Sequence, residues 1–290
     1  MNRLSCVTVL FAAAVATASA QIPVEKTLLW EISGKNFPAP CYLFGTIHEI
    51  CERDLIISDT LRSKFTATEQ LALELKIDDP QLETKMLKVT ALPEGKILKD
   101  YLTSRDYEMV VHYMNDTLGF DFEKYETRKP EVLLSVMGVR PRRCKVTSWE
   151  SKLASMAKKS EKPVLGLETV EEQFALMDRK PIDVQLKELI GQIRDAQMTR
   201  KKLEDLYVLY QNQDIAGISR MMTDSMHSKE YREFERVIVY ERNKNWIPVI
   251  ERLGKSKPTF FAVGGAHLGG EHGLIALLRQ RGLTVKPVWQ

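Results

Sequence analysis

Two histidines stand three residues after a glycine, each shortly behind an apolar run. His48 follows the run Cys41–Phe44, and His267 follows the run Pro258–Val263. With 15 Gly and 5 His in 290 residues, composition alone predicts well under one Gly-x-x-His match. A third match ends at His272. Because this match begins a predicted helix and does not end a predicted strand, His272 is a weaker candidate for a site residue than His48 and His267. The equivalent positions of His48 and His267 favour a shared chemical site over two unrelated tight turns.

Two carboxylates occupy similar positions at the ends of predicted strands. Glu74 lies near the end of the run Gln70–Leu75, where the leucines alternate onto the opposite face. Glu168 directly follows the run Pro163–Leu167. Each has an ordinary alternative: a surface ion pair of Glu74 with Lys76, and for Glu168 an acidic first turn of a helix.

These four side chains predict a metal site with hydrolytic chemistry. In open α/β sheets, ligands bind beyond the carboxyl ends of the strands, where loops from different strands converge. Two imidazoles with one or more carboxylates suit zinc, manganese or cobalt and leave positions for water. A bound ion would lower the pKa of that water and polarise a carbonyl group. The sequence contains no nucleophile elbow, phosphate loop, dinucleotide fingerprint or H-E-x-x-H motif that would indicate another mechanism.

The elements that must position these residues alternate between β-prone runs and helical patterns, which predicts an α/β fold. We expect a mixed central β-sheet flanked by helices, with a helical insertion or lid at residues 182–253 before the C-terminal strands. The predicted strands are Thr27–Ile32, Cys41–Phe44, Gln70–Leu75, Pro163–Leu167, Pro258–Val263 and Leu283–Val288. The predicted helices are Ile56–Phe65, Tyr107–Leu118, Glu131–Val139, Trp149–Lys159 and Val170–Asp178.

The first twenty residues have the pattern of a secretory signal peptide. Arg3 gives a positive end, the apolar run Leu4–Ala16 follows, and the small residues of Ala18–Ala20 precede Gln21. We therefore expect an exported protein, periplasmic or secreted, whose mature domain covers residues 21–290. No later run reaches the roughly 18 to 20 apolar residues of a membrane-spanning helix, so we expect no transmembrane anchor in the mature chain.

Composition and charge exclude several protein classes. A hydrophobic fraction of 44% with 28% charged residues is typical of a folded globular protein and not of a disordered or collagen-like chain. Lys and Arg number 42 against 39 Asp and Glu, which gives a net charge of +3. This balance is too small for the basic surface of a dedicated nucleic-acid-binding protein.

Three cysteines remain after the predicted signal peptide, in a compartment where disulfides persist. Cys41 opens an apolar run that predicts a buried strand, where a free thiol behaves as a small hydrophobic group. We therefore favour a disulfide between Cys51 and Cys144, with Cys41 free. Three reduced, inert cysteines are the alternative.

Five segments share their order and spacing with a known family. They are Tyr42–His48, Leu73–Leu75, Leu165–Thr169 with Gln173, Glu241–Asn243 with Trp246, and Val263–Leu268. In this arrangement the chain from about Leu28 to Val288 resembles the TraB/PrgY/GumN family, which is related to the Tiki proteases and more distantly to the ChaN and erythromycin-esterase proteins. The resemblance covers nearly the whole predicted mature chain.

The resemblance implies a site similar to that of metal-dependent peptidases of the Tiki type. His48 and His267 become the first-choice ligands, with manganese or cobalt as the supporting ion. Glu74 matches an acidic strand end and becomes a ligand or the general base.

The resemblance also assigns residues around the ligands. Arg242 and Asn243 match a paired motif on a late helix that faces the site. Arg242 would stabilise an oxyanion or a carboxylate, since its guanidinium offers a fixed fork of donors, and Asn243 would orient a water molecule. Glu168 matches a recurrent acidic position and would orient a ligand from behind it.

Two hypotheses of function follow. The leading one is an exported metal-dependent hydrolase, peptidase-like, that acts on a peptide or another small extracytoplasmic substrate. The rival is a non-catalytic exported protein that binds a peptide, haem or polysaccharide intermediate in the same cleft. Metal-dependent turnover separates the two.

Overall fold

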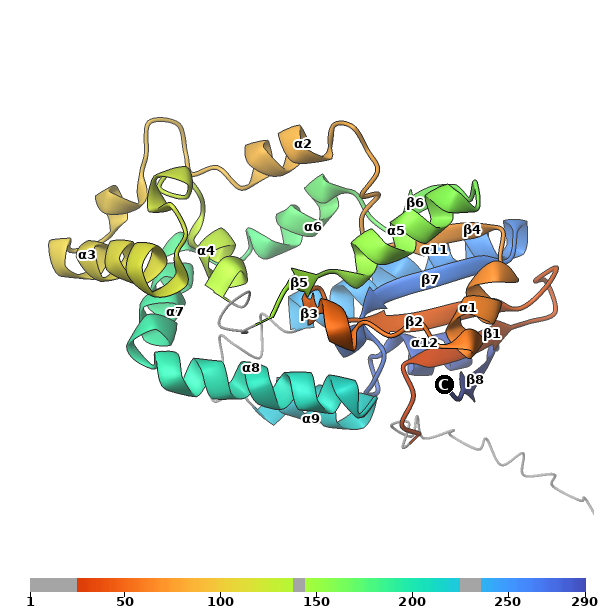
Figure 1. Ribbon diagram of the computed structural model, residues 1–290. Coiled ribbons are helices and arrows are strands. Elements are labelled where there is room, and N and C mark those ends of the chain that lie inside the picture. The colour runs from red at the N-terminus through yellow and green to blue at the C-terminus, as the bar shows by residue number, and fades with distance from the viewer. Residues whose placement is uncertain (1–24, 138–143, 225–235) are drawn as a thin grey trace, which may run out of the picture.

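A mixed sheet of six strands forms the centre of the larger lobe of the protein (Figure 1). The computed structural model describes residues 25–137, 144–224 and 236–290. The strands are β1 (Leu29–Ser33), β2 (Cys41–Thr46), β4 (Gln70–Leu73), β6 (Val164–Gly166), β7 (Thr259–Gly264) and β8 (Thr284–Val288). Their order across the sheet is β6-β4-β7-β2-β1-β8. The first four are parallel to one another, whereas β1 is antiparallel to both of its neighbours.

The register of the parallel strands brings three loops to one edge of the sheet. Thr46 at the end of β2 pairs with Gly264 at the end of β7, and Leu73 at the end of β4 pairs with Ala262. Because parallel strands end on the same side, the segments that follow β4, β7 and β2 leave the sheet next to one another. This carboxyl edge is where both predicted histidines and Glu74 lie.

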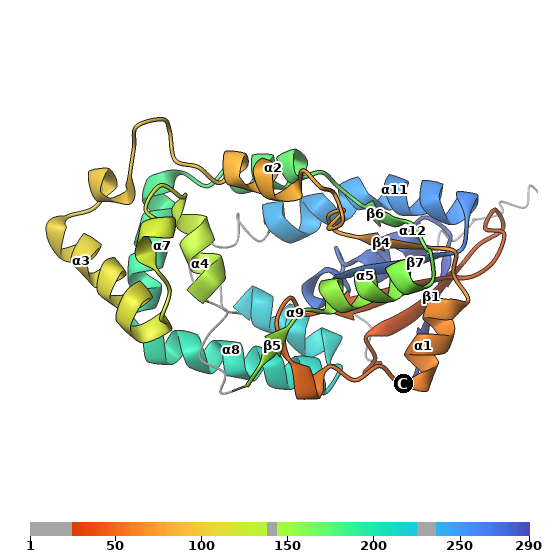
Figure 2. The same ribbon diagram turned by 45° about the horizontal axis from the view of Figure 1, so that its top comes forward.

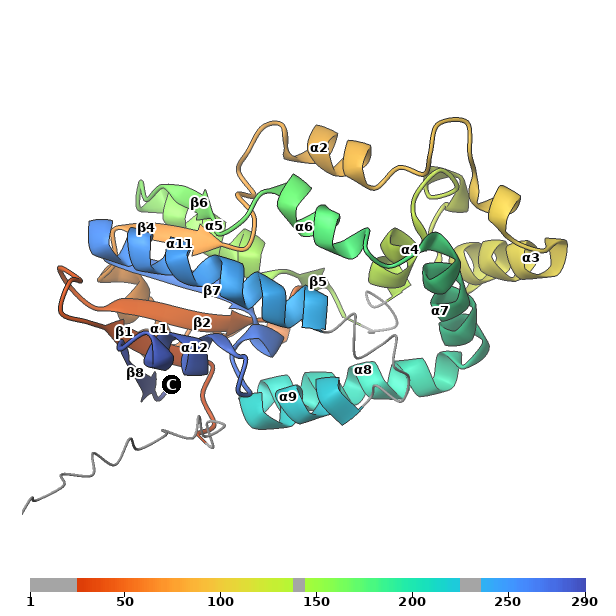
Figure 3. The same cartoon turned by 180° about the vertical axis from the view of Figure 1, so that it is seen from behind.

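Helices cover both faces of the sheet. Helices α1 (Asp59–Thr66) and α5 (Trp149–Lys159) lie on one face, and α11 (Arg242–Ser256) and α12 (Leu274–Gln280) lie on the other (Figures 1 and 3). Strands with helices on both faces are apolar throughout, and β2 is buried along its whole length. The largest side chains of this core are Trp30, Phe44, Phe65, Trp246 and Phe260.

A second, smaller lobe of helices has a hydrophobic core of its own. Its main elements are α3 (Ser104–His112), the π-helix Tyr113–Leu118, α4 (Pro130–Met137) and α7 (Ile182–Arg194). The buried side chains of this core include Leu98, Val110, Met114, Leu133 and Leu189. In Figure 2 these helices gather at the end remote from the sheet. Figures 1 and 3 show α2 (Leu82–Val89), α6 (Val170–Met177) and α8 (Ala196–Gln211) running between the two lobes.

The segment 182–253 is helical wherever the structure describes it, but it does not form a single unit. It contains α7, α8, α9 (Ile215–Asp224), the π-helix Arg236–Glu241 and most of α11. Helix α7 joins the core of the smaller lobe, whereas α11 packs on β7. The helices around the site therefore come from parts of the chain both before and after β6 in the sequence, and not from this segment alone.

The predicted α/β fold is confirmed, and all six predicted strands form the sheet. The sequence pattern does not predict the small ladder of β3 (Ile50–Cys51) with β5 (Val146–Thr147), since strands of two residues carry no periodicity. It also does not predict α2, none of whose residues is buried. In the ranges that the structure describes, no helix combines the length and the apolar character needed to cross a membrane. The predicted signal peptide, residues 1–20, lies outside the described residues.

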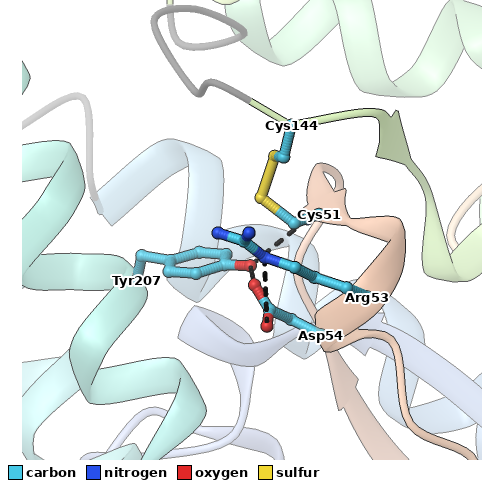
Figure 4. The surroundings of a disulfide bond; sticks show 5 residues. All are labelled: Cys51, Arg53, Asp54, Cys144 and Tyr207. Atoms are coloured by element: carbon cyan, nitrogen blue, oxygen red, sulfur yellow. Dashed lines mark hydrogen bonds and ion pairs between the residues drawn. A yellow bond between two sulfur atoms is a disulfide. The ribbon is translucent and has the colours of Figure 1, made fainter.

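The predicted disulfide is confirmed: Cys51 and Cys144 are bonded, 93 residues apart in the sequence (Figure 4). Cys41 is free and buried in β2, where burial raises the pKa of its thiol to about 11. A thiol with so high a pKa is almost fully protonated at neutral pH and is a poor nucleophile. Cys41 therefore acts as a small apolar side chain of the sheet.

Candidate active site

A cavity of about 1150 Å³ lies between the carboxyl edge of the sheet and the helices of the smaller lobe. On the sheet side it is lined by His48, Glu74, Arg242, Gly264 and His267. On the helical side its lining is mainly apolar and includes Met86, Leu87, Val132, Leu134, Phe174, Met177, Ile218 and Met222. A few convergent polar groups in a largely apolar hollow are the usual form of a binding or active site.

Glu74 directly follows β4, and its carboxylate is buried at the sheet edge. Its Oε1 accepts a hydrogen bond from the backbone N–H of Gly264 at 2.8 Å, and its Oε2 pairs with Nη2 of Arg242 at 2.5 Å. Burial by itself would raise the pKa of Glu74, but the charge of Arg242, the two nearby histidines and the N–H of Gly264 together outweigh it, and the pKa falls to about 2. Lys76 pairs instead with Asp78, so the alternative of a surface pair with Glu74 is wrong.

The guanidinium of Arg242 is fixed in orientation by Glu168. Nε and Nη2 of Arg242 both donate to Oε1 of Glu168, at 2.9 and 2.6 Å. Trp246, one turn further along α11, donates its Nε1–H to the other oxygen of Glu168 at 3.1 Å, and Gln173 donates to Oε1 at 3.0 Å. Burial raises the pKa of Glu168, and the bonds from Arg242 oppose that rise. The carboxylate of Glu168 thus stands behind Arg242 and orients it.

His267 lies in the short turn after β7 and is held by Asn243. Oδ1 of Asn243 lies 2.8 Å from Nδ1 of His267, while Nδ2 of Asn243 donates to the backbone carbonyls of His267 and His272. Because the amide nitrogen of Asn243 already donates to two carbonyls, its oxygen accepts the proton of Nδ1. Burial lowers the pKa of His267 to about 3, so the imidazole is neutral and the lone pair of its Nε2 faces Nη1 of Arg242 at 3.3 Å.

His48 lies in the loop between β2 and β3 and is held by Glu150. Oε1 of Glu150 lies 3.1 Å from Nδ1 of His48 and accepts a hydrogen bond from the hydroxyl of Thr46 at 2.7 Å. The side chain of His48 is 70% exposed toward the cavity, whereas that of Glu150 is only 16% exposed. The hydrogen bond to Glu150 raises the pKa of His48 to about 9, together with the charges of Glu74 and Glu150 and against a smaller opposing effect of burial.

Sequence reasoning missed Glu150. It is the second residue of α5, behind the N-cap Ser148, where a carboxylate is ordinary helix-start chemistry. Nothing in its local sequence distinguishes it from Glu172 at the start of α6, which closes a capping box with Thr169. Its role follows only from the distance to His48, 102 residues away in the sequence.

The three proposed ligands converge at the end of β7. A methyl group placed on Gly264 would lie 3.3 Å from Oε1 of Glu74, 3.6 Å from Cδ2 of His267 and 4.0 Å from Nε2 of His48. In both histidines Nδ1 faces an oxygen atom, as is usual for metal-bound histidines, and Nε2 is the nitrogen that would face an ion. The donor set therefore fits a divalent ion such as zinc, manganese or cobalt.

Arg242 occupies part of the same space. Its Nη1 lies 3.3 Å from Nε2 of His267, and that nitrogen is 3.9 Å from Oε1 of Glu74. Within the described parts of the chain, no group of three or more His, Cys, Asp or Glu side chains is already arranged to hold a metal ion. An ion bound by Nε2 of His267 would have to displace the guanidinium from that nitrogen.

The remaining predicted residues take supporting positions. Asn243 and Glu168 orient His267 and Arg242 and do not line the cavity. His272, ranked below the other two histidines, also does not line it: its ring packs on Tyr240 at 4.5 Å and its Nε2 pairs with Glu271 at 3.0 Å.

Comparisons with known proteins give this chain a family. Residues 28–287 match the TraB/PrgY/gumN family. The chain is 25% identical over 319 residues to the protein named Metalloprotease TIKI2 of Danio rerio, 24% over 318 residues to that of Xenopus tropicalis, and 22% over 325 residues to the Metalloprotease TIKI homolog of Nematostella vectensis. Each comparison covers 90% of this chain, which spans 60%, 59% and 67% of the length of these relatives. No solved structure matches it. On the match over residues 28–287, the chain belongs to the TraB/PrgY/gumN family.

Proposed function

We propose that this protein is an exported metal-dependent hydrolase of the peptidase type. The observation that carries the proposal is the pair of imidazoles at the wall of the cavity. Each has Nδ1 bonded to an oxygen, so Nε2 is the nitrogen that would bind an ion, in His267 after displacement of Arg242. Both rings lie around Gly264 beside the ionised carboxylate of Glu74. The names of the relatives, which call them metalloproteases, point to the same class.

His48, His267 and Glu74 would hold the ion, which when bound would lower the pKa of a water molecule and polarise the substrate carbonyl. Glu74 keeps one oxygen on the N–H of Gly264, so it approaches the ion from a fixed direction. His267 meets the ion as a neutral imidazole and needs no proton removed at neutral pH.

Arg242 is the group best placed to stabilise negative charge on the substrate. It lines the cavity, it is only 4% exposed, and Glu168 fixes the plane of its guanidinium. The indole ring of Trp246 packs against the guanidinium of Arg242, with the guanidinium carbon 4.7 Å from the ring centroid. Donors that are held in place before the reaction stabilise a developing oxyanion without a cost of reorganisation.

A peptide with bulky apolar side chains fits the rest of the cavity. The cavity of about 1150 Å³ lies above the usual range of sites for single small ligands, so it has room for several residues. Methionine and leucine side chains of α2, α4 and α6 form the wall that faces the polar cluster, and the flexible methionines can adapt to different apolar groups.

Export is supported by the disulfide and by the N-terminal pattern. A disulfide between Cys51 and Cys144 persists in an oxidising compartment and is rare in the cytosol. Residues 1–20 have the sequence pattern of a secretory signal peptide. We place the mature protein in the periplasm or outside the cell.

A peptide-library digest tests the proposed activity. The metal-stripped protein is incubated with the library alone and with manganese, cobalt or zinc, and products are identified by mass spectrometry. We expect cleavage only with an added ion, abolished in His267→Ala and retained in His112→Ala, a control histidine that is 74% exposed on α3. Absence of cleavage with every ion, for a folded protein that binds the ion, would contradict a peptidase.

The second candidate function is a non-catalytic protein that binds a peptide, haem or polysaccharide intermediate. It is favoured by one observation: Arg242 bridges Glu74 and Glu168 and also contacts His267, a closed arrangement that needs no ion. In that case ligand binding in the cavity would persist in the metal-stripped protein, and the digest would remain unchanged with every ion.

A further inference from the structure

The loop that carries His48 is fastened to the segment that carries Glu150. The two-residue strands β3 and β5 pair Ile50 with Thr147, and Cys51 lies beside Val146. The pair of Ile50 and Thr147 is two residues after His48 and three before Glu150 in the sequence. The ladder therefore sets the distance between the imidazole and the carboxylate.

Three further contacts secure this ladder. The Cys51–Cys144 disulfide joins its outer end, and the N–H of Glu52 donates to the carbonyl of Lys145 at 2.8 Å. From α8, the hydroxyl of Tyr207 donates to Asp54 at 2.7 Å and accepts the N–H of Cys51 at 3.2 Å (Figure 4). We call the ladder, the disulfide and Glu150 together the His48 clamp.

His48 needs such a clamp because its surroundings do not fix it. With 70% of its side chain exposed, packing places little restraint on the orientation of the ring. Glu150 supplies the restraint, since it is 16% exposed and is itself held by Thr46 at 2.7 Å and by Ser148 at 3.1 Å. One fixed carboxylate oxygen on Nδ1 directs the other ring nitrogen toward the end of β7.

We infer that Glu150 is the positioning residue for His48, and that the Cys51–Cys144 disulfide keeps Glu150 and His48 in register. The inference rests on the proposed function in one respect: the nitrogen that the clamp presents, Nε2 of His48, is a proposed metal ligand. It adds a residue and a covalent bond that act on the proposed site through His48.

Hydrogen exchange of the metal-free protein tests the clamp without any assumption about metal. We expect amides of residues 46–52 to lose protection in Glu150→Ala and in the double variant Cys51→Ser, Cys144→Ser. The matched control is Glu172→Ala, which removes a first-turn carboxylate from α6 instead of α5. Unchanged protection in both clamp variants, with the global fold retained by circular dichroism, would overturn the inference.

Cobalt affinity, measured by calorimetry, tests the consequence for the site. At pH 9, where a proton on His48 competes only weakly with the ion, we expect 10- to 100-fold weaker binding in Glu150→Ala, the usual effect of removing a partner of a ligating histidine. In Glu150→Gln an amide oxygen still accepts from Nδ1, so most of the affinity should return. In a His48→Ala background, Glu150→Ala should cause no further loss.

Two outcomes separate this inference from the proposed function. If the wild-type protein bound no metal ion, the proposed function would fail, and the exchange experiment alone would decide whether the clamp exists. If the wild type bound cobalt and Glu150→Ala bound it equally well, the positioning role would be overturned and the metal site would stand. The same conclusion would follow if Glu150→Ala weakened cobalt binding by the same factor with His48 present and in the His48→Ala background.

Discussion

At the scale of single residues, the site depends on the absence of a side chain at one position as much as on the side chains around it. That position is Gly264, because the absence of a side chain there leaves open the space on which Glu74, His48 and His267 converge. The sequence analysis found these residues through strand ends and Gly-x-x-His spacing. It did not find Glu150, whose partner is remote in sequence and whose helix-start position has an ordinary explanation.

Gly264→Ala should disable the site with little effect on the fold. The new methyl group would lie 3.3 Å from Oε1 of Glu74, so the carboxylate must move while β7 stays in place. We expect at least about a tenfold loss of metal affinity, the usual scale for disturbing the support of a ligand. The control is Gly191→Ala in α7, which meets no atom within 4 Å and should stabilise the helix by about 0.5–1 kcal/mol. Equal metal affinity in both variants would contradict this account.

Metal affinity should rise with pH up to about pH 9. In the free protein Glu150 raises the pKa of His48 to about 9, so below that pH an incoming ion must displace a proton from the imidazole. His267 adds no dependence above pH 4, because burial lowers its pKa to about 3. Calorimetric titration with manganese at pH 6, 7, 8 and 9 measures the slope. The rise should end at lower pH in Glu150→Ala, and an affinity independent of pH would exclude His48 as a ligand.

At the scale of elements, hydrophobic pattern and length decide what the sequence can predict. The six strands of the sheet carry continuous or alternating apolar runs, and each was predictable. Helix α2 was not predicted and buries none of its residues. The ladder of β3 and β5 forms through tertiary contacts and the disulfide, and so has no local signal.

Removal of the disulfide should lower the stability of the protein as well as loosen the clamp. The bond closes a long loop, since its cysteines are 93 positions apart in the sequence, and so restricts the unfolded chain. We expect Cys51→Ser, Cys144→Ser to lose about 2–4 kcal/mol of the free energy of unfolding, the usual range for a disulfide. Urea denaturation of the two proteins measures the difference. Cys41→Ser is the comparison for loss of a thiol that is not bonded, and an unchanged midpoint in the double variant would contradict the expectation.

At the scale of the whole molecule, two lobes with separate cores enclose one cavity. The sheet lobe supplies the proposed ligands, and α4 of the helical lobe together with α2, α6 and α9 supplies most of the apolar wall. The sequence predicted the sheet and a helical insertion, but not that the helices of residues 82–137 share the smaller lobe with α7. Long-range packing decides which helices meet across a cavity. The hydrophobic periodicity along the chain carries no information about these contacts.

This arrangement predicts that substrate affinity depends on the apolar wall of the cavity and metal affinity on the carboxyl edge of the sheet. Met177 on α6 lines the apolar wall, so Met177→Ser should raise KM for peptides with apolar side chains several-fold and leave cobalt affinity unchanged. Met198→Ser on α8, a residue that is 57% exposed, is the matched control and should change neither. Equal loss of metal affinity and of peptide affinity in Met177→Ser would contradict separate roles for the apolar wall and the carboxyl edge of the sheet.

The most direct test of the central claim is a calorimetric titration of manganese, cobalt and zinc into the metal-stripped mature protein and into the double variant His48→Ala, His267→Ala. The account predicts binding of one ion per chain to the wild type and its loss in the variant, with the fold of both verified by circular dichroism. Equal binding by the two proteins, or binding by neither, would contradict a metal site built on this pair of histidines.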